Sequence, residues 1–107
     1  MDQAGYPYSM PIEPCVYMLA SGKRGYIYIG VTSDMAARYW QHQSGAFDGF
    51  AKRRNCKRLV RVEMYATMDE AIAREQQLKN WHRDWKISLV ERENPDWRDL
   101  GPEMGLR

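Results

Sequence analysis

Two short β-rich runs constrain this chain most, because only a short glycine-containing loop separates them. The runs span residues 15–19 and 26–31, and the loop spans residues 21–25. β-Branched and aromatic side chains favour strands, and a short connection with glycine favours a hairpin. We therefore expect two neighbouring antiparallel strands at the start of the fold.

The second run has two faces of different character, because side chains alternate along a strand. Tyr26, Tyr28 and Gly30 share one face. The other face is aliphatic and consists of Ile27, Ile29 and Val31. The aliphatic face is the expected core.

A helix is expected next, over residues 35–43. It ends at the Ser44-Gly45 pair, and three residues before it have side chains that can cap its start: Thr32, Ser33 and Asp34. At about 100° per residue, Arg38 and His42 fall on one face of this helix. The alternative to a catalytic role is an ordinary structural one for both residues, because amphipathic helices often carry such side chains at their margins.

A third strand is expected over residues 59–65, followed by a helix that Thr67 and Glu70 begin with a capping box. That helix should reach Trp81 or His82. Its expected apolar face consists of Met68, Ala71, Ile72, Leu78 and, in the same helix or a successor, Trp85. The resulting order is ββαβαα.

Glu75 lies near the middle of that apolar arc. An ionised carboxylate on an apolar face is costly unless a cation or hydrogen-bond donors meet it. Arg38 or a divalent metal ion would meet this need. Two structural explanations remain open as well: Glu75 forms an ion pair, or its carboxylate reaches water at the edge of the apolar face.

Length and composition indicate one domain, since 107 residues with 44% hydrophobic content form a single core. We expect an N-terminal extension over residues 1–12, the domain over 13–93 and a C-terminal tail over 94–107. Cys15 and Cys56 lack paired spacing and are expected to be free thiols rather than a disulfide. The start of the chain lacks the pattern of a signal peptide, so we expect a cytoplasmic protein without a membrane anchor.

The middle third of the chain is basic, with eight Lys or Arg against two Asp over residues 21–58. Five of these cations fall within seven positions: Lys52, Arg53, Arg54, Lys57 and Arg58. Such a run is either a solvated loop or a contact for nucleic-acid phosphates. Just before it, Phe47 and Phe50 add rings on which bases can stack.

In this order and spacing, the residues resemble the GIY-YIG nuclease superfamily, and more closely its small single-domain bacterial members. The YIG element is intact as Tyr28-Ile29-Gly30. The GIY element is Cys15-Val16-Tyr17, which keeps the tyrosine. The segment from Arg38 to His42 is similar to the family's Arg-x-x-x-His, and Glu75 to its metal-binding glutamate. The resemblance covers about residues 13–100, including the segment 94–100.

The resemblance implies a compact α/β (α+β) domain with a central three-stranded antiparallel sheet flanked by helices. It also implies phosphodiester hydrolysis with one divalent cation, Mg²⁺ or Mn²⁺. Glu75 would bind the metal, and Arg38 would hold the scissile phosphate. Tyr17 and Tyr28 would position or deprotonate the attacking water, with no preference between them, and His42 would assist.

Two positions depart from the wider family. Val31 stands where some members have lysine, and Ile87 where some have asparagine. Lys79 or Lys86 would compensate, or would simply be surface residues of an amphipathic helix.

The expected function is a metal-dependent DNA endonuclease of repair or recombination, acting on single-stranded, branched or damaged DNA. The alternative is a non-catalytic nucleic-acid-binding or adaptor module that keeps the fold. A purely structural protein, whose tyrosines only pack, fits the polar pattern least. We expect a nucleic-acid partner, DNA rather than RNA, and a protein that is a monomer or a homodimer. Three tryptophans are expected in the core rather than at a dimer contact: Trp81, Trp85 and Trp97.

Overall fold

The fold is built on a three-stranded antiparallel sheet, described here from a computed structural model of residues 13–46 and 49–106. Strand β1 (Cys15–Ala20) is central, and it pairs with β2 (Ile27–Thr32) on one side and β3 (Arg58–Met64) on the other. The expected hairpin and third strand are confirmed, each within a residue at either end. The expected extension over residues 1–12 lies outside the described residues.

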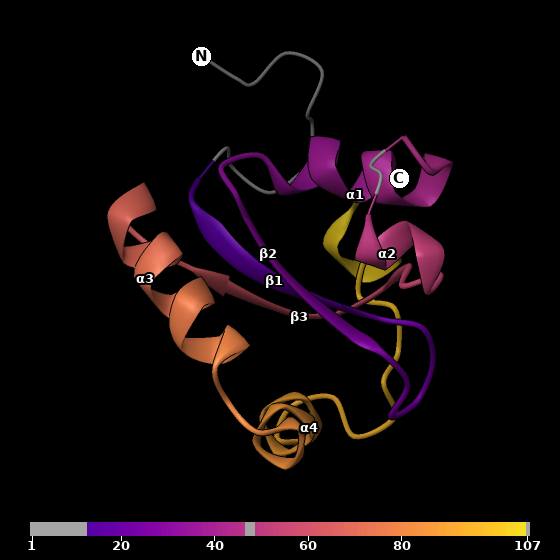
Figure 1. The fold of residues 1–107 in the computed structure, drawn as a ribbon. Coiled ribbons are helices and arrows are strands. Elements are labelled where there is room, and N and C mark those ends of the chain that lie inside the picture. The colour runs from indigo at the N-terminus through magenta and orange to yellow at the C-terminus, as the bar shows by residue number, and fades with distance from the viewer. Residues whose placement is uncertain (1–12, 47–48, 107) are drawn as a thin grey trace.

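Helices follow the strands in the expected order (Figure 1). The main helices are α1 (Met35–Ser44), α3 (Met68–Lys79) and α4 (Arg83–Glu91). Two short elements add to the expected pattern: the one-turn helix α2 (Phe50–Arg53) and the 3₁₀ helix η1 (Pro102–Met104). The helix α2 lies at the start of the basic run, which the sequence alone indicated only as a loop or a phosphate contact.

Local capping explains where the helices begin. Of the three candidate caps of α1, Asp34 is used, because its Oδ1 accepts from the Ala37 N–H at 3.1 Å. The capping box of α3 is confirmed, with reciprocal hydrogen bonds between Thr67 and Glu70. Helix α3 ends at Lys79, slightly earlier than expected, because the extended backbone of His82 breaks the helix and starts α4.

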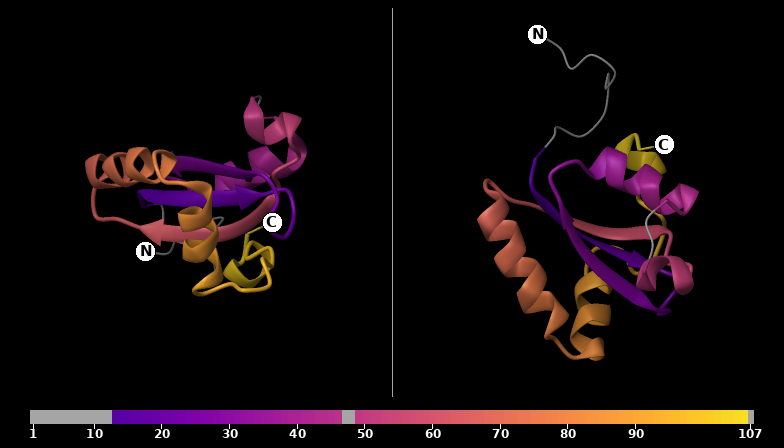
Figure 2. Two further views of the ribbon diagram at one scale, coloured as in Figure 1. Left: turned by 60° about the horizontal axis from the view of Figure 1, so that its bottom comes forward. Right: turned by 45° about the horizontal axis from the view of Figure 1, so that its top comes forward.

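Both faces of the sheet are covered, as Figures 1 and 2 show, with α3 and α4 on one side and α1 and α2 on the other. The expected aliphatic core is confirmed on the α3 side, where Ile29 is buried and Ile27 and Val31 pack against the cluster. A second core on the tyrosine face was not expected. It includes Tyr17, Leu19, Met35, Tyr39 and Leu59.

Two expected core residues are instead exposed. Ile72 is 37% exposed, because it follows the fully buried Ala71 by one residue and so points about 100° away from it. Trp85 is 56% exposed, because it belongs to the separate helix α4 rather than to an extension of α3. The other two tryptophans do contribute to the core: Trp97 is fully buried and Trp81 packs against it in part.

The segment expected as a C-terminal tail lies along the outer edge of β3. The Leu100 N–H donates to the Leu59 carbonyl at 2.7 Å, and the Leu59 N–H donates to Asp99 Oδ1 at 3.1 Å. Asn94 Nδ2 donates to the Val60 carbonyl at 3.2 Å. These bonds satisfy edge groups that would otherwise be open to another strand.

Cys15 and Cys56 are buried free thiols, as expected. None of the helices in the described part of the chain is long and apolar enough to cross a membrane.

Candidate active site

Three rings from three different elements meet on the tyrosine face of the sheet. Tyr17 comes from β1, Tyr28 from β2 and His42 from α1. Their ring centroids are 5.5–6.2 Å apart, and Tyr17 Oη lies 3.0 Å from His42 Nε2. The structure therefore brings together three of the site residues expected from the sequence.

Gly30 makes this arrangement possible. It is the register partner of Tyr17 across the β1–β2 pair. A Cβ atom at position 30 would lie only 2.4 Å from Tyr17 Cζ and from Tyr17 Oη. The tyrosine ring thus covers the glycine, and any larger residue would displace it. The tyrosine of the GIY element therefore requires glycine at the third position of the YIG triplet, because no other residue leaves room for its ring.

Burial sets the protonation of Tyr17 and His42. Tyr17 is fully buried and His42 is 4% exposed. Burial, and then the nearby Arg38 charge, lower the pKa of His42 to about 4, so the imidazole is neutral at pH 7. Burial is also the largest cause that raises the pKa of Tyr17, although hydrogen bonding and charge from Arg38 oppose the rise. Tyr17 therefore remains a neutral phenol beside a neutral imidazole.

Arg38 stands one helical turn before His42 on α1 and is partly buried. Its positive charge acts on Tyr17, His42 and Cys15. A permanent positive charge that acts on both members of the Tyr17–His42 pair would attract an anion to this face. Arg38 and His42 therefore both act on Tyr17, in keeping with the helical face that they were expected to share.

Glu75 occupies the sheet-facing side of α3, between Ala71 and Leu78, which are both fully buried. Its side chain is only 14% exposed, and Oε2 lies 3.0 Å from Lys79 Nζ. Helix α3 packs against β1 and β2 on the face opposite the Tyr17–Tyr28–His42 cluster, so Glu75 approaches the sheet from the other side. The cation that meets Glu75 in this structure is therefore Lys79.

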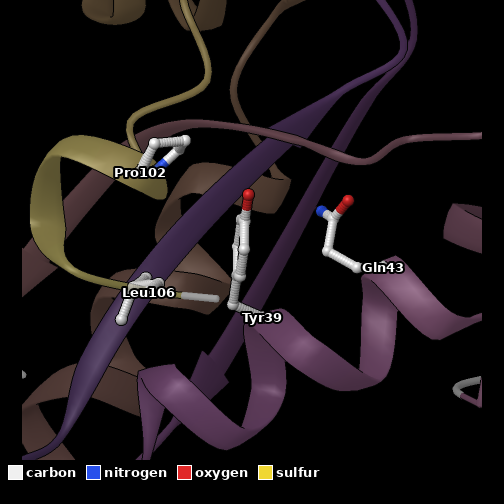
Figure 3. A pocket seen from close by; sticks show the side chains of 4 residues that line it. All are labelled: Tyr39, Gln43, Pro102 and Leu106. Carbon is white, nitrogen blue, oxygen red and sulfur yellow. The ribbon is translucent and has the colours of Figure 1, made fainter.

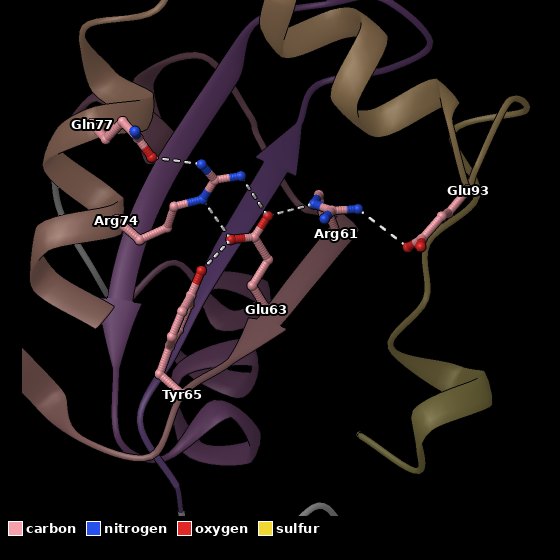
Figure 4. Close-up of polar contacts among 6 residues, drawn as sticks. All are labelled: Arg61, Glu63, Tyr65, Arg74, Gln77 and Glu93. Carbon is pink, nitrogen blue, oxygen red and sulfur yellow. Dashed lines mark hydrogen bonds and ion pairs between the residues drawn. The ribbon is translucent and has the colours of Figure 1, made fainter. Parts of the chain in front are cut away.

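An ion-pair network anchors α3 one residue away from Glu75 (Figure 4). Arg74 Nε donates to Glu63 Oε1 at 2.8 Å, and Glu63 also accepts from Arg61 at 2.8 Å and from Tyr65 Oη at 2.9 Å. Burial alone would raise the pKa of Glu63, but these three donors outweigh burial and lower it to about 2. Glu63 is ionised at neutral pH and joins β3 to α3.

Sequence reasoning missed this anchor. The only local signal is that Arg61, Glu63 and Tyr65 alternate along the third strand and so share one face. The partner, Arg74, is eleven residues further on, and only the packing of α3 brings it to Glu63. Sequence periodicity therefore could not predict this network.

Sequence reasoning also missed a contact between α1 and the C-terminal segment. Tyr39 Oη donates to Asp99 Oδ2 at 2.8 Å. Tyr39 also lines a pocket of about 340 Å³ together with Gln43, Pro102 and Leu106 (Figure 3). The helix that supplies Arg38 and His42 is thus braced by the C-terminal segment.

The basic run lies on and after α2, and Phe47, one of the two rings expected beside it, lies outside the described residues. Lys57 is partly buried. The other four cations are exposed: Lys52, Arg53, Arg54 and Arg58. Arg58 Nη1 donates to the Trp97 carbonyl at 3.0 Å, so this residue has a structural contact. Arg54 Cζ lies 4.7 Å from the centroid of the Tyr26 ring.

A family model described as the GIY-YIG catalytic domain matches residues 13–88. The chain belongs to the GIY-YIG family. The match spans all five expected catalytic residues, from Tyr17 to Glu75, and ends inside α4. GIY-YIG domains form a nuclease superfamily, whose members act on nucleic acids and generally use divalent metal ions.

Curated relatives of this GIY-YIG chain are small bacterial proteins. It is 36% identical over 66 residues to the UPF0213 protein of Staphylococcus aureus strain Mu3, a match that covers 62% of this chain and 80% of that protein. The UPF0213 proteins SAV0488 of strain Mu50 and SA0446 of strain N315 match to the same extent. No solved structure matches the chain significantly.

The two residues that depart from the wider GIY-YIG pattern are used in core packing. Val31 and Ile87 are both partly buried and pack against the core on the α3 side of the sheet. Each therefore serves the core as an apolar side chain.

Proposed function

We propose that this GIY-YIG protein is a metal-dependent endonuclease that hydrolyses phosphodiester bonds in DNA. The observation that carries the proposal is the Tyr17–Tyr28–His42 cluster beside Arg38, assembled from three elements over Gly30. We further propose a cytoplasmic role in repair or recombination, on single-stranded, branched or damaged DNA.

Burial distinguishes the roles of the two tyrosines. Tyr17 is fully buried and its raised pKa keeps its proton in place, so it serves to position His42. Tyr28 is only partly buried, and we assign it the contact with the attacking water. Arg38 would hold the scissile phosphate, because its planar, permanently charged fork can contact two oxygens.

Glu75 is the residue that we assign to a divalent metal ion. In the described ranges 13–46 and 49–106, no group of three or more His, Cys, Asp or Glu side chains is placed to hold a metal ion, so a single carboxylate would have to serve. Mg²⁺ is usually held by one or two carboxylates, with water and substrate phosphates completing its shell. Glu75 would be that carboxylate, and a bound Mg²⁺ or Mn²⁺ would supply positive charge to the phosphate oxygens.

The test is a panel of labelled DNA and RNA structures incubated with the purified protein and Mg²⁺ or Mn²⁺. We expect cleavage of at least one DNA structure. Glu75→Gln should abolish it, whereas Lys79→Gln, which breaks the same ion pair from its other end, should retain most of it. Equal effects of the two substitutions would show that Glu75 has only a structural role and would overturn the metal assignment.

A second candidate function is a nucleic-acid-binding or adaptor module without turnover. The observation that favours it is the use of Val31 and Ile87 in core packing, since some relatives in the wider family have polar residues there. It predicts salt-sensitive binding that weakens when the five cations of the basic run are neutralised, with no cleavage in any metal. Cleavage that depends on Glu75 would exclude it.

A further inference from the structure

An aromatic and cationic cluster lies beyond Tyr28 on the same face of the hairpin. Tyr26 and Phe50 meet edge to face with centroids 6.1 Å apart, and the Arg54 guanidinium lies over the Tyr26 ring. Tyr26 is 50% exposed and Phe50 is 38% exposed. This Tyr26–Phe50–Arg54 cluster is therefore open to solvent although it uses large apolar rings.

The backbone of the cluster is held firmly. The Tyr26 N–H donates to Ser21 Oγ at 2.9 Å, and its carbonyl accepts from the Ser21 N–H at 3.0 Å. Phe50 lies on α2, which contacts β2 directly. The rings are thus presented by the end of the hairpin and by a packed helix, rather than by an unattached loop.

The segment that continues from Phe50 is basic. Residues 49–62 contain no Asp or Glu, and both Arg54, which lies over the Tyr26 ring, and its neighbour Arg53 are exposed. Exposed rings combined with cations suit single-stranded nucleic acid, because bases stack on the rings while the cations hold phosphates. An acidic or purely apolar partner would use only one of these two features.

The position relative to Tyr28 is equally specific. Tyr26 and Tyr28 are two residues apart on one face, and the strand rise of about 3.4 Å per residue separates them by about 7 Å. That distance is comparable with the step between neighbouring nucleotides of an extended strand. Because Tyr28 is the residue assigned to the attacking water, a base on the cluster would belong to a nucleotide next to the one that carries the scissile phosphate.

We propose that the Tyr26–Phe50–Arg54 cluster is a base-stacking subsite that holds an unpaired base beside the bond to be cut. The inference rests on the proposed nuclease function and names its substrate class as unpaired DNA. In a duplex the faces of each base are already covered by its neighbours, so the cluster gains contact only with a base that is free of the stack. The subsite thus selects single strands or unpaired regions.

Binding to three DNA ligands tests the subsite without cleavage. Fluorescence anisotropy in EDTA would compare a labelled single strand, the same strand with abasic sites, and the matching duplex. The variants are Tyr26→Leu and Phe50→Leu, which keep apolar bulk but remove the rings, and Arg54→Lys, which keeps the charge but removes the plane. Trp85→Leu is the matched control, because Trp85 is similarly exposed but lies on α4 at the opposite face.

We expect each ring variant to weaken binding of the intact single strand about 5-fold or more, the effect of losing one stacked base. The abasic strand and the duplex should bind each variant as they bind the parent, and Trp85→Leu should match the parent on all three ligands. Equal losses on the intact and abasic strands, or no loss at all, would overturn the subsite.

The same measurements separate this inference from the proposed function. If the parent cuts DNA in Mg²⁺ while Tyr26→Leu and Phe50→Leu bind and cut as the parent does, the nuclease assignment stands and the subsite is wrong. If the parent binds none of the three ligands, the DNA substrate is wrong and the subsite falls with it. Thermal unfolding of each variant confirms that the compared proteins are folded.

Discussion

Gly30 lies directly under the ring of Tyr17, its partner across the β1–β2 pair. The two residues come from the two halves of the family signature and are thirteen positions apart. Because the ring occupies the space where a Cβ would be, the two positions depend on each other sterically. This relationship and other buried contacts of the fold lead to five predictions.

Gly30→Ala should destabilise the protein. The new methyl group would lie 2.4 Å from the Tyr17 ring, which is fully buried and cannot move freely. We expect a loss of about 1–3 kcal/mol in the free energy of unfolding, measured with urea. Gly22→Ala is the matched control, since nothing lies within 4 Å of its Cβ, and it should change stability by less than about 0.5 kcal/mol. Equal stabilities would contradict the steric account.

Tyr17→Phe should cost about 1–2 kcal/mol, although it removes a single oxygen. The substitution leaves His42 Nε2 without its 3.0 Å partner in a buried position. Tyr26→Phe is the control at an exposed position just before β2, and it should have almost no effect on unfolding. A Tyr17→Phe protein as stable as the parent would mean that the hydrogen bond contributes nothing.

His42 should titrate at about pH 4 in the folded protein. The unfolded chain binds this proton below about pH 6.5, its ordinary value, whereas the folded protein excludes it until about pH 4. The unfolded state therefore binds more protons between these values, so stability falls as pH falls from about 6.5 to about 4 and does not depend on His42 above that window. The measurement is the NMR titration of the imidazole protons in a His82→Gln background, which leaves His42 as the only histidine. A folded-state pKa near 6.5 would contradict the burial argument.

Arg74→Gln should destabilise the protein more than a similar change at an exposed ion pair. Glu63 is 11% exposed in its side chain and loses one of its three donors, so we expect a cost of about 1–3 kcal/mol. Arg98→Gln breaks the pair with Glu103, in which both side chains are 53% exposed, and should cost about 0–1 kcal/mol.

The Glu63 network also predicts a pH dependence of its own. Its pKa is lowered from 4.5 to about 2, so its contribution is complete above pH 4.5 and is lost as pH falls towards 2. The difference in unfolding free energy between the parent and Arg74→Gln should therefore shrink over this acid range. A difference that stays constant down to pH 2 would mean that Arg74 does not lower the pKa of Glu63.

Sequence reasoning succeeded where the physics is local. Two β-rich runs joined by a glycine-containing loop predicted the hairpin. Thr67 and Glu70 predicted the start of α3, and the four-residue spacing of Arg38 and His42 predicted one helical face. It was wrong about Ile72 and Trp85, because helical periodicity does not show where a helix breaks or how wide its buried stripe is.

The sequence by itself determined the strand and helix order, the family and the side chains available for chemistry. These follow from propensity, capping and residue spacing, which act over a few positions. Only the tertiary structure decided that Tyr17 would sit over Gly30 against His42, that Lys79 would meet Glu75, and that Tyr26, Phe50 and Arg54 would share one exposed cluster. Sheet register, burial and the path of the C-terminal segment set those relationships, and each depends on contacts between residues far apart in the chain.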